Sequence, residues 1–563
     1  MKMKTVLCMF LLLVLTCSFN GSTAALAWSP RLQPKPREIS FDHYHTYSEM
    51  VRMLKTMRCM FPRLMQLYPI GESFLGKKIW AVEITNRFYG PRPSGKPGFL
   101  FLGEHHGDEV IAKEVALYFI WYLLTNYGKD PRVTYLLNTR TVYVIPLVNP
   151  DGNDLTLLQG QCQRLNARPL DEDLDGLFDE DPPEDINGDG IITEMRKWDE
   201  TLGDYIYFPY EGVDNDGDGM VNEDFIGGVD LNRNYEYGWQ PFPWDVPYFG
   251  EYPFSEPETQ AVRNFVLTHP NIATGFDTHS GAQIILYPWS HTFEQPPDAN
   301  TYETLSQKYS SLTGYPYGQT PYVLYPCTGT TMDWMYGSQG IMHFTNEVFG
   351  PYYFDPEDPF DFTEFIEAYP DVEYPWQEFE HPQLGTVEIG GFWFFRFYNP
   401  PENEILEVCE RNLPMVLNLV EVTPNLEITS IRFYVSEPVM PSTVTRRRPY
   451  FPYRDITISI ELTNQGFLNT STQHALQSGI AQPVTVKLLV SPNAKLVEGN
   501  PVTKFDMLQS NQTVGVSWKI RVKVPSISWA LVTASTPKGG TEKLLMVIKA
   551  LPRTTTVITV PIR

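Results

Sequence analysis

Between residues 40 and 422 the chain alternates two patterns of hydrophobic and polar positions. Short apolar runs predict buried strands, and apolar residues at helical spacing predict amphipathic helices. The expected strands are 77–85, 98–104, 140–148, 273–279, 283–288 and 340–348, and the expected helices are 109–128, 255–269 and 401–422. We expect the second helix to begin with a capping box, because Glu258 follows Ser255 by three places. This alternation is typical of an α/β fold with helices over a mostly buried sheet.

The pattern changes after residues 423–428. Apolar and polar residues then alternate with a period of two, and helical spacing disappears. The alternating segments are 455–466, 482–491, 514–525 and 543–550. We therefore expect a separate, all-β, immunoglobulin-like sandwich domain over 423–563. It lacks the Cys…Trp…Cys arrangement of antibody domains, because no cysteine lies beyond Cys409.

The first 27 residues have the features of a secretory signal peptide. Lys2 and Lys4 precede an apolar run at 6–15, and the small residues of Ala-Leu-Ala at 25–27 offer a cleavage site. The apolar run is shorter than a membrane-spanning helix requires, and no later segment reads as a membrane span. We expect a secreted, extracellular protein whose first folded domain covers 28–422.

The net charge of the chain argues against some classes of binding partner. The formal net charge of −24 at pH 7 argues against nucleic acid and anionic membranes as binding partners.

Beyond the signal segment four cysteines remain, which are Cys59, Cys162, Cys327 and Cys409. They can pair in three ways, and the sequence does not choose among these pairings. Four cysteines in so long a chain do not make a disulfide scaffold, so the fold must depend on a packed core.

Most of the negative charge lies in one segment, 169–229. It holds 13 Asp and 7 Glu against Arg196 and Lys197, which is −18 of the total. Three runs within it place oxygen side chains at alternate positions before a glycine, as calcium-binding loops do. The candidate calcium ligands are Asp171, Asp173, Asp175 and Asp179, then Asp185, Asn187 and Asp189, then Asp214, Asp216 and Asp218. The last position departs from the EF-hand, since Pro182, Arg196 and Phe225 stand where a bidentate carboxylate is needed. We expect structural calcium here, because closely packed carboxylates repel one another without a cation; the alternative is a solvated acidic loop.

A series of short motifs marks the candidate catalytic centre. "GEHHGDE" at 103–109 is followed, in order, by "NPDG" (149–152), "QRLNAR" (163–168), "VDLNRNY" (229–235), "FDTHSG" (276–281), "LYPCTGTTMDW" (324–334) and "GIMHFTNEV" (340–348). This order resembles the zinc carboxypeptidases of the M14, carboxypeptidase A-like family, over roughly residues 40 to 422. The resemblance implies a mixed central β-sheet flanked by helices.

The family pattern of His-x-x-Glu and a distant second histidine implies one catalytic zinc ion. It assigns His106, Glu109 and His279 as ligands and leaves His105 as a bystander. Two nitrogens and one carboxylate leave the fourth position of zinc open for water. We expect no ligand role for Asp277.

The resemblance also assigns the residues that act on the scissile bond. Glu347 is expected to be the general base for a zinc-activated water, and Arg164 to stabilise the carbonyl oxyanion. Asp108 departs from the digestive members, which place an arginine at this position of the motif.

Substrate-binding residues follow from the same matching. Asn232 and Arg233 are expected to bind a terminal carboxylate, for which a planar guanidinium is suited, and Tyr325 to close over the substrate. Met332 and Ser290 match the positions that select the side chain. Neither is charged, so we expect a preference for apolar or aromatic C-terminal residues.

The sequence thus predicts a secreted, zinc-dependent carboxypeptidase that hydrolyses the C-terminal bond of peptides or proteins with a free carboxylate. Two alternatives stay open. One is an M14-like amidohydrolase that acts on peptidoglycan stem peptides, and the other is a catalytically inactive peptide-binding or adhesion protein. We expect the C-terminal β-sandwich to be an accessory module that binds a cell-surface or polymer partner.

Overall fold

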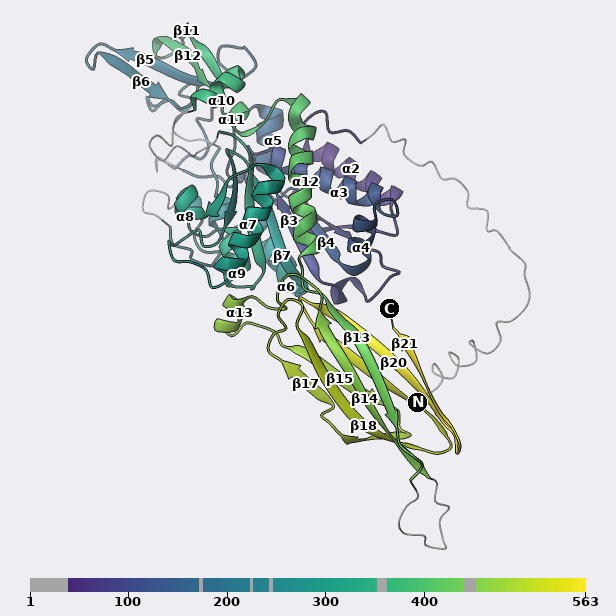
Figure 1. Cartoon of the computed structure of the whole chain (residues 1–563). Helices are drawn as coiled ribbons and strands as arrows, with labels where there is room; N and C mark the ends of the chain where they lie inside the picture. Colours follow the sequence, from purple (N-terminus) through teal and green to yellow (C-terminus); the bar gives the residue numbers. More distant parts are fainter. Residues whose placement is uncertain are drawn as a thin grey trace, which may run out of the picture. The chain divides into compact units, whose positions relative to one another are not determined.

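The structure, a computed structural model, describes residues 39–171, 176–222, 226–241, 247–351, 362–439 and 452–562 (Figure 1). The predicted signal peptide lies outside the described residues, as do Asp173 and Asp175. The helices are α2 (Tyr47–Met60), α3 (Ile111–Asn126), α4 (Pro131–Thr139), α5 (Pro150–Gln159), α6 (Pro257–Thr268), α7 (Ala299–Thr313), α8 (Thr320–Val323), α9 (Thr331–Gly337), α10 (Thr363–Ala368), α11 (Phe394–Tyr398), α12 (Ile405–Glu421) and α13 (Gln473–Gln477). Within the described part, no helix combines the length and apolar character needed to cross a membrane.

An eight-stranded mixed sheet forms the centre of the first region. Its strands are β1 (Met65–Glu72), β2 (Lys78–Ile84), β3 (Gly98–Gly103), β4 (Thr141–Ile145), β7 (Ile272–His279), β8 (Ala282–Tyr287), β9 (Tyr317–Gln319) and β10 (Met342–Phe349), in the order β1-β2-β4-β3-β7-β10-β8-β9. Strands β4, β3, β7 and β10 are parallel neighbours. The predicted α/β class is confirmed.

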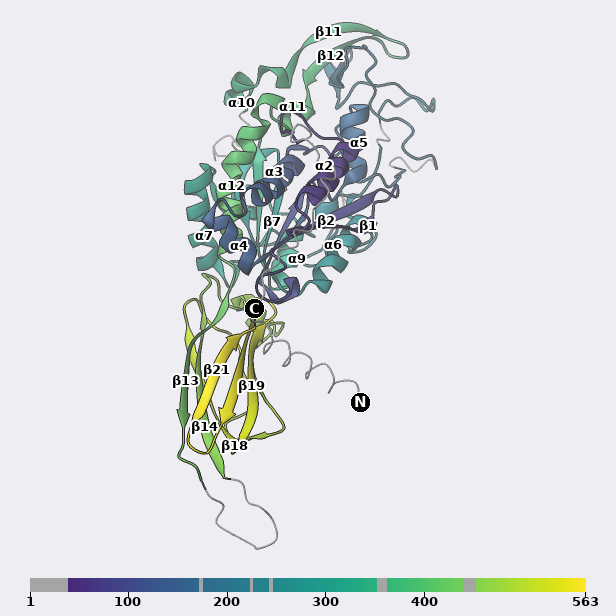
Figure 2. The same ribbon diagram turned by 90° about the vertical axis from the view of Figure 1, so that its right-hand side faces the viewer.

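Alternate residues of the central strands pack against helices on opposite faces of the sheet. Phe99 and Phe101 of β3 belong to a core formed with helices α2, α3, α4, α7 and α12. Leu100 and Leu102 face the other way, into a core formed with α6 and α9. Figures 1 and 2 show α3 and α12 side by side over the sheet. Because both faces are covered, β3 has no polar side chain along its whole length.

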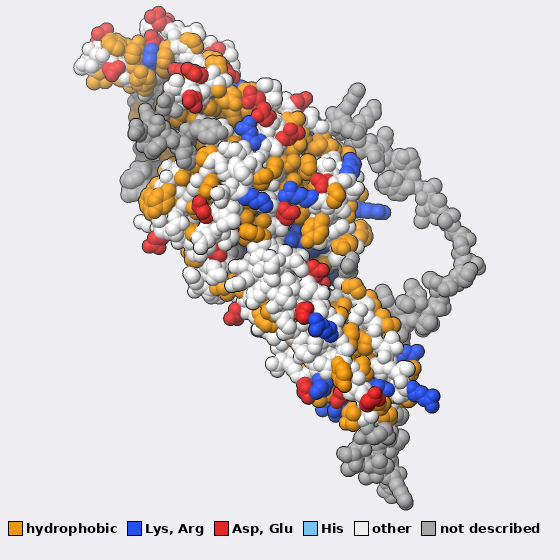
Figure 3. Space-filling view, in the orientation of Figure 1, with side chains coloured by type: hydrophobic (Ala, Val, Ile, Leu, Met, Phe, Trp, Pro, Cys, Tyr) orange, Lys and Arg blue, Asp and Glu red, His pale blue; other side chains and the backbone are white. Residues whose placement is uncertain are grey.

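A second, smaller sheet joins the acidic segment to a later part of the chain. Strands β5 (Glu194–Asp199) and β6 (Asp204–Phe208) pair with β11 (Glu373–His381) and β12 (Gly385–Phe392) in the order β11-β12-β5-β6. One face forms a small core around Met195, Val387 and Ile389. Hydrophobic atoms are visible over this lobe at the top left of Figure 3. The sequence reading did not predict this sheet.

Two antiparallel sheets make up the C-terminal region. The first is β13 (Leu426–Val435), β14 (Tyr453–Asn464), β18 (Thr513–Lys523) and β16 (Ala494–Glu498). The second is β17 (Val502–Phe505), β15 (Val484–Val490), β19 (Ser526–Thr536), β20 (Gly540–Ala550) and β21 (Thr555–Pro561). Buried residues of both sheets share one core around Trp518. The all-β prediction is confirmed, with the short helix α13 as an addition.

Side chains from the C-terminal region reach the first region. The carboxylate of Asp298, next to α7, accepts backbone hydrogen bonds from Gln473 and His474 of α13 at 2.9 and 3.1 Å. Lys538 Nζ donates to the carbonyl oxygen of Gln339 at 2.6 Å. Residues 39–563 accordingly group as one compact unit by their contacts.

The start of α6 differs from the expectation. The capping-box prediction at Ser255 is wrong, because α6 begins after Glu256 without a side-chain cap. The Ser255 hydroxyl instead donates to Glu256 Oε1, and that oxygen also binds Arg168. The four cysteines beyond the signal segment are all free thiols in the structure.

Candidate active site

The proposed zinc ligands meet at the C-terminal edge of the parallel strands. His106 and Glu109 follow the end of β3, and His279 is the last residue of β7. On β10, Glu347 is paired directly with His279. In open α/β sheets this edge is where ligands bind, because the loops that leave parallel strands converge there.

A close backbone contact sets the path of the loop between β3 and α3. A Cβ atom at Gly107 would lie 2.4 Å from the carbonyl carbon of Gly152 in α5, so a side chain there would force the loop to move. The Gly107 N–H donates to the carbonyl oxygen of Arg164 at 3.2 Å. The loop that carries two ligands is therefore fixed against the segment that carries Arg164.

The three side chains converge on one point. His106 Nδ1 lies 2.7 Å from Glu109 Oε1, and His279 Nδ1 lies 2.8 Å from Glu109 Oε2. The two Nδ1 atoms are 3.1 Å apart. The three residues are at most 3 % exposed. Two imidazole nitrogens and one carboxylate at this spacing form a donor set that zinc prefers.

A second group of possible metal ligands shares His279 but contains His105 and Asp277. His105 Nε2 already contacts the hydroxyls of Tyr235 and Thr331 at 3.0 and 3.1 Å. Neither His105 nor Asp277 lines the adjoining cavity, whereas His106, Glu109 and His279 do. Of the two groups, only the latter leaves an open side that substrate can reach.

The pKa values of the ionisable groups in the site are shifted by burial and by neighbouring charges. Burial alone would raise the pKa of Glu109, but His106 and His279 outweigh it and hold this pKa well below its usual range. Burial, together with repulsion from His279, lowers the pKa of His105 to about 3. His105 is therefore neutral at physiological pH, as its hydrogen bond from a hydroxyl requires.

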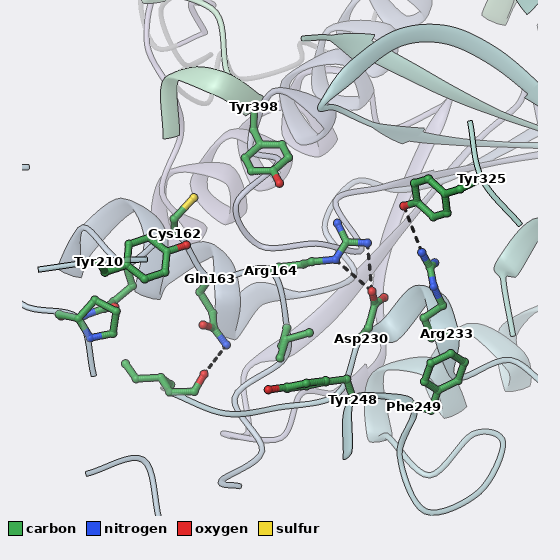
Figure 4. A pocket seen from close by; sticks show the side chains of 14 residues that line it. Cys162, Gln163, Arg164, Tyr210, Asp230, Arg233, Tyr248, Phe249, Tyr325 and Tyr398 are labelled. Atoms are coloured by element: carbon green, nitrogen blue, oxygen red, sulfur yellow. Dashed lines mark hydrogen bonds and ion pairs between the residues drawn. The ribbon is translucent and has the colours of Figure 1, made fainter. Parts of the chain in front are cut away.

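Each histidine ligand has an aspartate near its other nitrogen. Asp230 Oδ1 lies 3.0 Å from His106 Nε2, and Asp277 Oδ2 lies 3.8 Å from His279 Nε2. Sequence reasoning gave Asp230 no role, although it stands two places before Asn232 in the same motif. Asp230 also accepts a hydrogen bond from Arg164 Nε at 3.0 Å, as Figure 4 shows.

Glu347 faces this group across the cavity. Its Oε2 is buried and has no hydrogen-bond partner among the described residues. Burial and the negative charge of Glu109 raise the pKa of Glu347 to about 8. The structure therefore brings Glu347 and Arg164, both expected to act on the scissile bond, to the rim of the same cavity as the three ligands.

That cavity has a volume of about 380 Å³ and ends among uncharged side chains. Met332, Ser290, Leu286, Ala282 and Val323 are among them. Met332 is 2 % exposed, and the nearby carboxylate of Asp333 is turned away to accept the backbone N–H of Ser290 at 2.9 Å. Within the described residues that line this end, no side chain carries a charge.

Arg233 and Tyr325 line the same cavity, where it leads into the uncharged end around Met332. Arg233 Nη2 lies 3.4 Å from the Tyr325 hydroxyl (Figure 4). Arg233 Nη1 donates to the carbonyl oxygen of Asn232 at 2.9 Å. Both polar atoms of the Asn232 amide already have partners within the protein. Its Oδ1 accepts the N–H of Thr331 at 2.9 Å, and its Nδ2 lies 3.2 Å from His279 Nε2.

The acidic segment forms turns stabilised by its own carboxylates. Asp185 accepts N–H groups from Gly188 and Gly190, and Asp214 does so from Gly217 and Gly219. Of the predicted calcium ligands that are described, Asp171 and Asp179 accept backbone N–H groups, and Asn187, Asp189, Asp216 and Asp218 lie in the same turns. Among the described residues of this segment, one metal-sized group is present, formed by Asp181, Asp214 and Asp216, whose oxygens lie within 4.8 Å of one another.

Several known proteins are similar to this chain. Residues 50–362 match the family model described as zinc carboxypeptidase, Peptidase M14, and residues 456–546 match a model described only as a domain of unknown function. Carboxypeptidase A4 of Mus musculus is 24 % identical over 323 residues, which are 55 % of this chain and 64 % of the relative. Zinc carboxypeptidase A 1 of Anopheles gambiae is 27 % identical over 327 residues, 55 % of this chain and 61 % of the relative.

Among solved structures, carboxypeptidase A from Helicoverpa armigera is similar with a TM-score of 0.46 and 18 % identity, over 68 % of this chain and 74 % of that one. The chain spans less than two thirds of the length of the curated relatives named above. The matching family model nevertheless covers more than half of the chain. The chain therefore belongs to the zinc carboxypeptidase family, Peptidase M14.

Proposed function

We propose that this chain is a secreted, zinc-dependent carboxypeptidase that releases the C-terminal residue of peptides or proteins. The observation that carries the proposal is the convergence of His106, Glu109 and His279 beside a cavity with Arg233 at its mouth. An exopeptidase must combine a hydrolytic centre with a group that recognises a free chain end. Secretion is proposed from the signal pattern at residues 1–27.

The donor set suits zinc and leaves one side open to the cavity. Bound there, zinc would act as a Lewis acid and lower the pKa of a coordinated water toward neutrality. Glu347 is the neighbouring group that can take a proton from water and return it to the leaving amine. Its position in the cavity beside the ligands suits both steps, because one carboxylate can take up the proton and later return it.

Arg164 is held in place to meet the carbonyl oxygen of the scissile bond. Its guanidinium contacts Asp230 at 3.0 Å and Glu109 at 3.4 Å, yet it still lines the cavity. A fixed donor of this kind stabilises an oxyanion without having to reorganise during the reaction.

The far end of the cavity supports the choice of substrate. Arg233 offers a planar fork of donors for a terminal carboxylate, and Asn232 lines the cavity beside it. Tyr325 is 48 % exposed, so it is free to move over a bound chain end. Beyond Arg233 the uncharged lining around Met332 suits an apolar or aromatic side chain.

We also propose that Asp277 positions His279. If Nδ1 binds the metal, Nε2 must carry the hydrogen and needs an acceptor. The nearby Asn232 amide presents its NH₂ group, because its oxygen is bonded to Thr331, and so it cannot accept. Asp277 Oδ2 is buried, has no hydrogen-bond partner among the described residues and lies 3.8 Å away. The other oxygen of Asp277 is bonded to the Thr345 hydroxyl, which fixes the carboxylate.

Structural calcium in the acidic segment is a separate proposal. It is supported by three runs of oxygen side chains in register and by the group of Asp181, Asp214 and Asp216. The geometry differs from the loop expected from sequence, because Asp181 of the first run joins the third run. A divalent cation would relieve the repulsion among these carboxylates.

The first expected outcome concerns the chain end. Purified protein should release single C-terminal residues from peptides with a free carboxylate and none from the same peptides with a C-terminal amide, and a chelator should stop the release. Arg233→Lys should lower kcat/KM by about 10- to 100-fold, because a charged bidentate contact is lost. The exposed Arg92→Lys is the control. Cleavage of amidated peptides or of internal bonds would contradict the proposal.

The second outcome concerns proton transfer. Glu347→Gln keeps the shape of the side chain but cannot accept a proton, so kcat should fall by roughly 100- to 10,000-fold. Zinc content, measured by metal analysis, should stay at the wild-type value. Glu378→Gln, an exposed position on β11, is the control. Wild-type turnover in Glu347→Gln would rule out its role as the base.

The third outcome concerns metal binding. Asp277→Asn should weaken zinc binding by about 10- to 100-fold, because the hydrogen on His279 Nε2 loses its carboxylate acceptor. Competition with a chromophoric chelator measures this without any turnover. The exposed Asp506→Asn should bind zinc as the wild type does. Equal affinity in Asp277→Asn and the wild type would show that Asp277 does not position His279.

The fourth outcome concerns calcium. Adding calcium at about 100 times its Kd should stabilise the protein by about 2.7 kcal/mol, measured as a rise in Tm. Asp216→Asn should reduce this rise, because one charged ligand is lost, whereas Asp204→Asn on β6 should retain it. A Tm of the wild-type protein that does not respond to calcium would refute the proposal.

A further inference from the structure

The outer side of the second C-terminal sheet carries many apolar side chains. Side chains along a strand alternate between the two faces of a sheet. The inward set, which includes Val486, Val532 and Ile548, belongs to the core around Trp518. The outward set belongs to none of the hydrophobic cores in the described part of the chain, and most of it is apolar as well. Its apolar members, which we call the apolar face, are Leu489, Ile527, Trp529, Leu531, Leu545, Val547, Ile558 and Val560.

The strand register makes the apolar face continuous. One row consists of residues that are paired across β15, β19, β20 and β21: Leu489, Leu531, Leu545 and Val560. The neighbouring row is formed in the same way by Trp529, Val547 and Ile558. Leu489 is 58 % exposed and Ile558 is 57 % exposed. Soluble proteins rarely leave a large contiguous apolar patch in water, so this one indicates a binding surface.

The charged residues on this side of the sheet are all lysines. The register turns them outward beside the apolar face: Lys487, Lys504, Lys543 and Lys549. All four are exposed, and none has an ion-pair partner among the described residues. The five strands contain one acidic residue, Glu542, which is paired with the core residue Ala534 and therefore points to the opposite face. The outward side is thus cationic and apolar at once.

The outer side of the first sheet has a different character. It carries charges of both signs, and several of them are paired. Arg521 Nε lies 2.8 Å from Asp455 Oδ1, and Lys519 Nζ lies 2.6 Å from Glu498 Oε1. Paired charges of this kind suit a surface that faces water. The contrast between the two sheets points to the second one as the binding surface.

The net charge of the whole chain does not describe the apolar face. Residues 169–229 carry −18 of the net −24, and none of them belongs to a strand of the second sheet. Exposed charges more than about 8 Å apart are largely screened at physiological ionic strength. The lysines beside the apolar face therefore set the potential that a partner meets there. The argument against an anionic membrane applies to the average charge of the chain and not to this surface.

We propose that the apolar face binds the surface of a lipid bilayer that contains anionic lipids. The lysine ammonium groups would contact the anionic headgroups while their alkyl stems stay among apolar groups. The leucine, isoleucine and valine side chains would leave water for the boundary between headgroups and acyl chains. Trp529 suits this boundary, because its ring is apolar and its N–H is polar. A soluble acidic polymer would contact the lysines but would leave the apolar rows in water.

The test is co-sedimentation of the full chain with lipid vesicles. Vesicles of phosphatidylcholine with about 30 % phosphatidylserine should bind the wild-type protein at least about tenfold more strongly than phosphatidylcholine alone, and less so at high salt. The double variant Lys543→Gln/Lys549→Gln should weaken this binding by about 20- to 30-fold, because each lysine contributes about fivefold. The matched control Lys495→Gln/Lys523→Gln removes the same charge from exposed positions of the first sheet and should bind as the wild type does.

A single exposed substitution tests the apolar contribution. Ile558→Ser on the edge strand β21 should weaken binding to the same vesicles by about 5- to 10-fold, because one apolar side chain is lost from the contact. Wild-type binding by this variant would show that only charge acts and would overturn the proposal of a bilayer.

The other outcomes are equally decisive. If the wild-type protein does not bind anionic vesicles, the proposal is wrong whether or not the variants fold. Equal loss of binding in the two double variants would show that net charge governs binding, and the assignment of this face would fail. A wild-type dimer in analytical ultracentrifugation that Ile558→Ser converts into monomers would assign the face to a second copy of the chain instead. None of these measurements depends on the proposed carboxypeptidase function.

Discussion

The active site depends on the parallel register of three neighbouring strands. Strands β3, β7 and β10 run in the same direction, so their C-terminal ends lie at one edge of the sheet. The pairing of Glu347 with His279 across β10 and β7 sets the proposed base beside a metal ligand. Since side chains alternate between faces along a strand, a shift of one residue in this register would turn Glu347 away from the cavity.

The same edge concentrates charge in a buried place, and the fold compensates for it locally. Carboxylates that are isolated from water are costly, but Glu109 and Asp230 are surrounded by histidines and by Arg164. Their pKa values are held low in consequence. A site that binds a dication must contain deprotonated ligands, and the low pKa of Glu109 keeps the carboxylate of the donor set ionised.

The acidic segment links two parts of the site that sequence analysis treats as independent. Its hairpin pairs with residues 373–392, which lie in the chain between Glu347 and Tyr398. Gln161 and Gln163 bond the segment to the strip that carries Arg164. A change in the turns around Asp214 could therefore alter the cavity that Tyr210 and Arg164 line without touching the zinc ligands.

Much of the site could be predicted from the sequence because its residues are carried by short, ordered motifs. The assignment of His106, Glu109 and His279 as ligands followed from the resemblance of these motifs to the zinc carboxypeptidases, and the sandwich followed from its period of two. Local patterns of this kind depend on which residues are neighbours in the chain. They do not depend on distant contacts.

Tertiary structure decided what depends on residues far apart. The resemblance had already set His105 apart from the ligands, but only the packed fold shows its contacts with Tyr235 and Thr331. Asp230 and Asp277 gained their positions only when three strands and a loop came together. The small sheet, the group of Asp181 with Asp214 and Asp216, and the cavity between Tyr210 and Tyr398 likewise join segments that no local pattern relates. Periodicity records which face of an element is buried, whereas only the packed fold determines which side chains meet there.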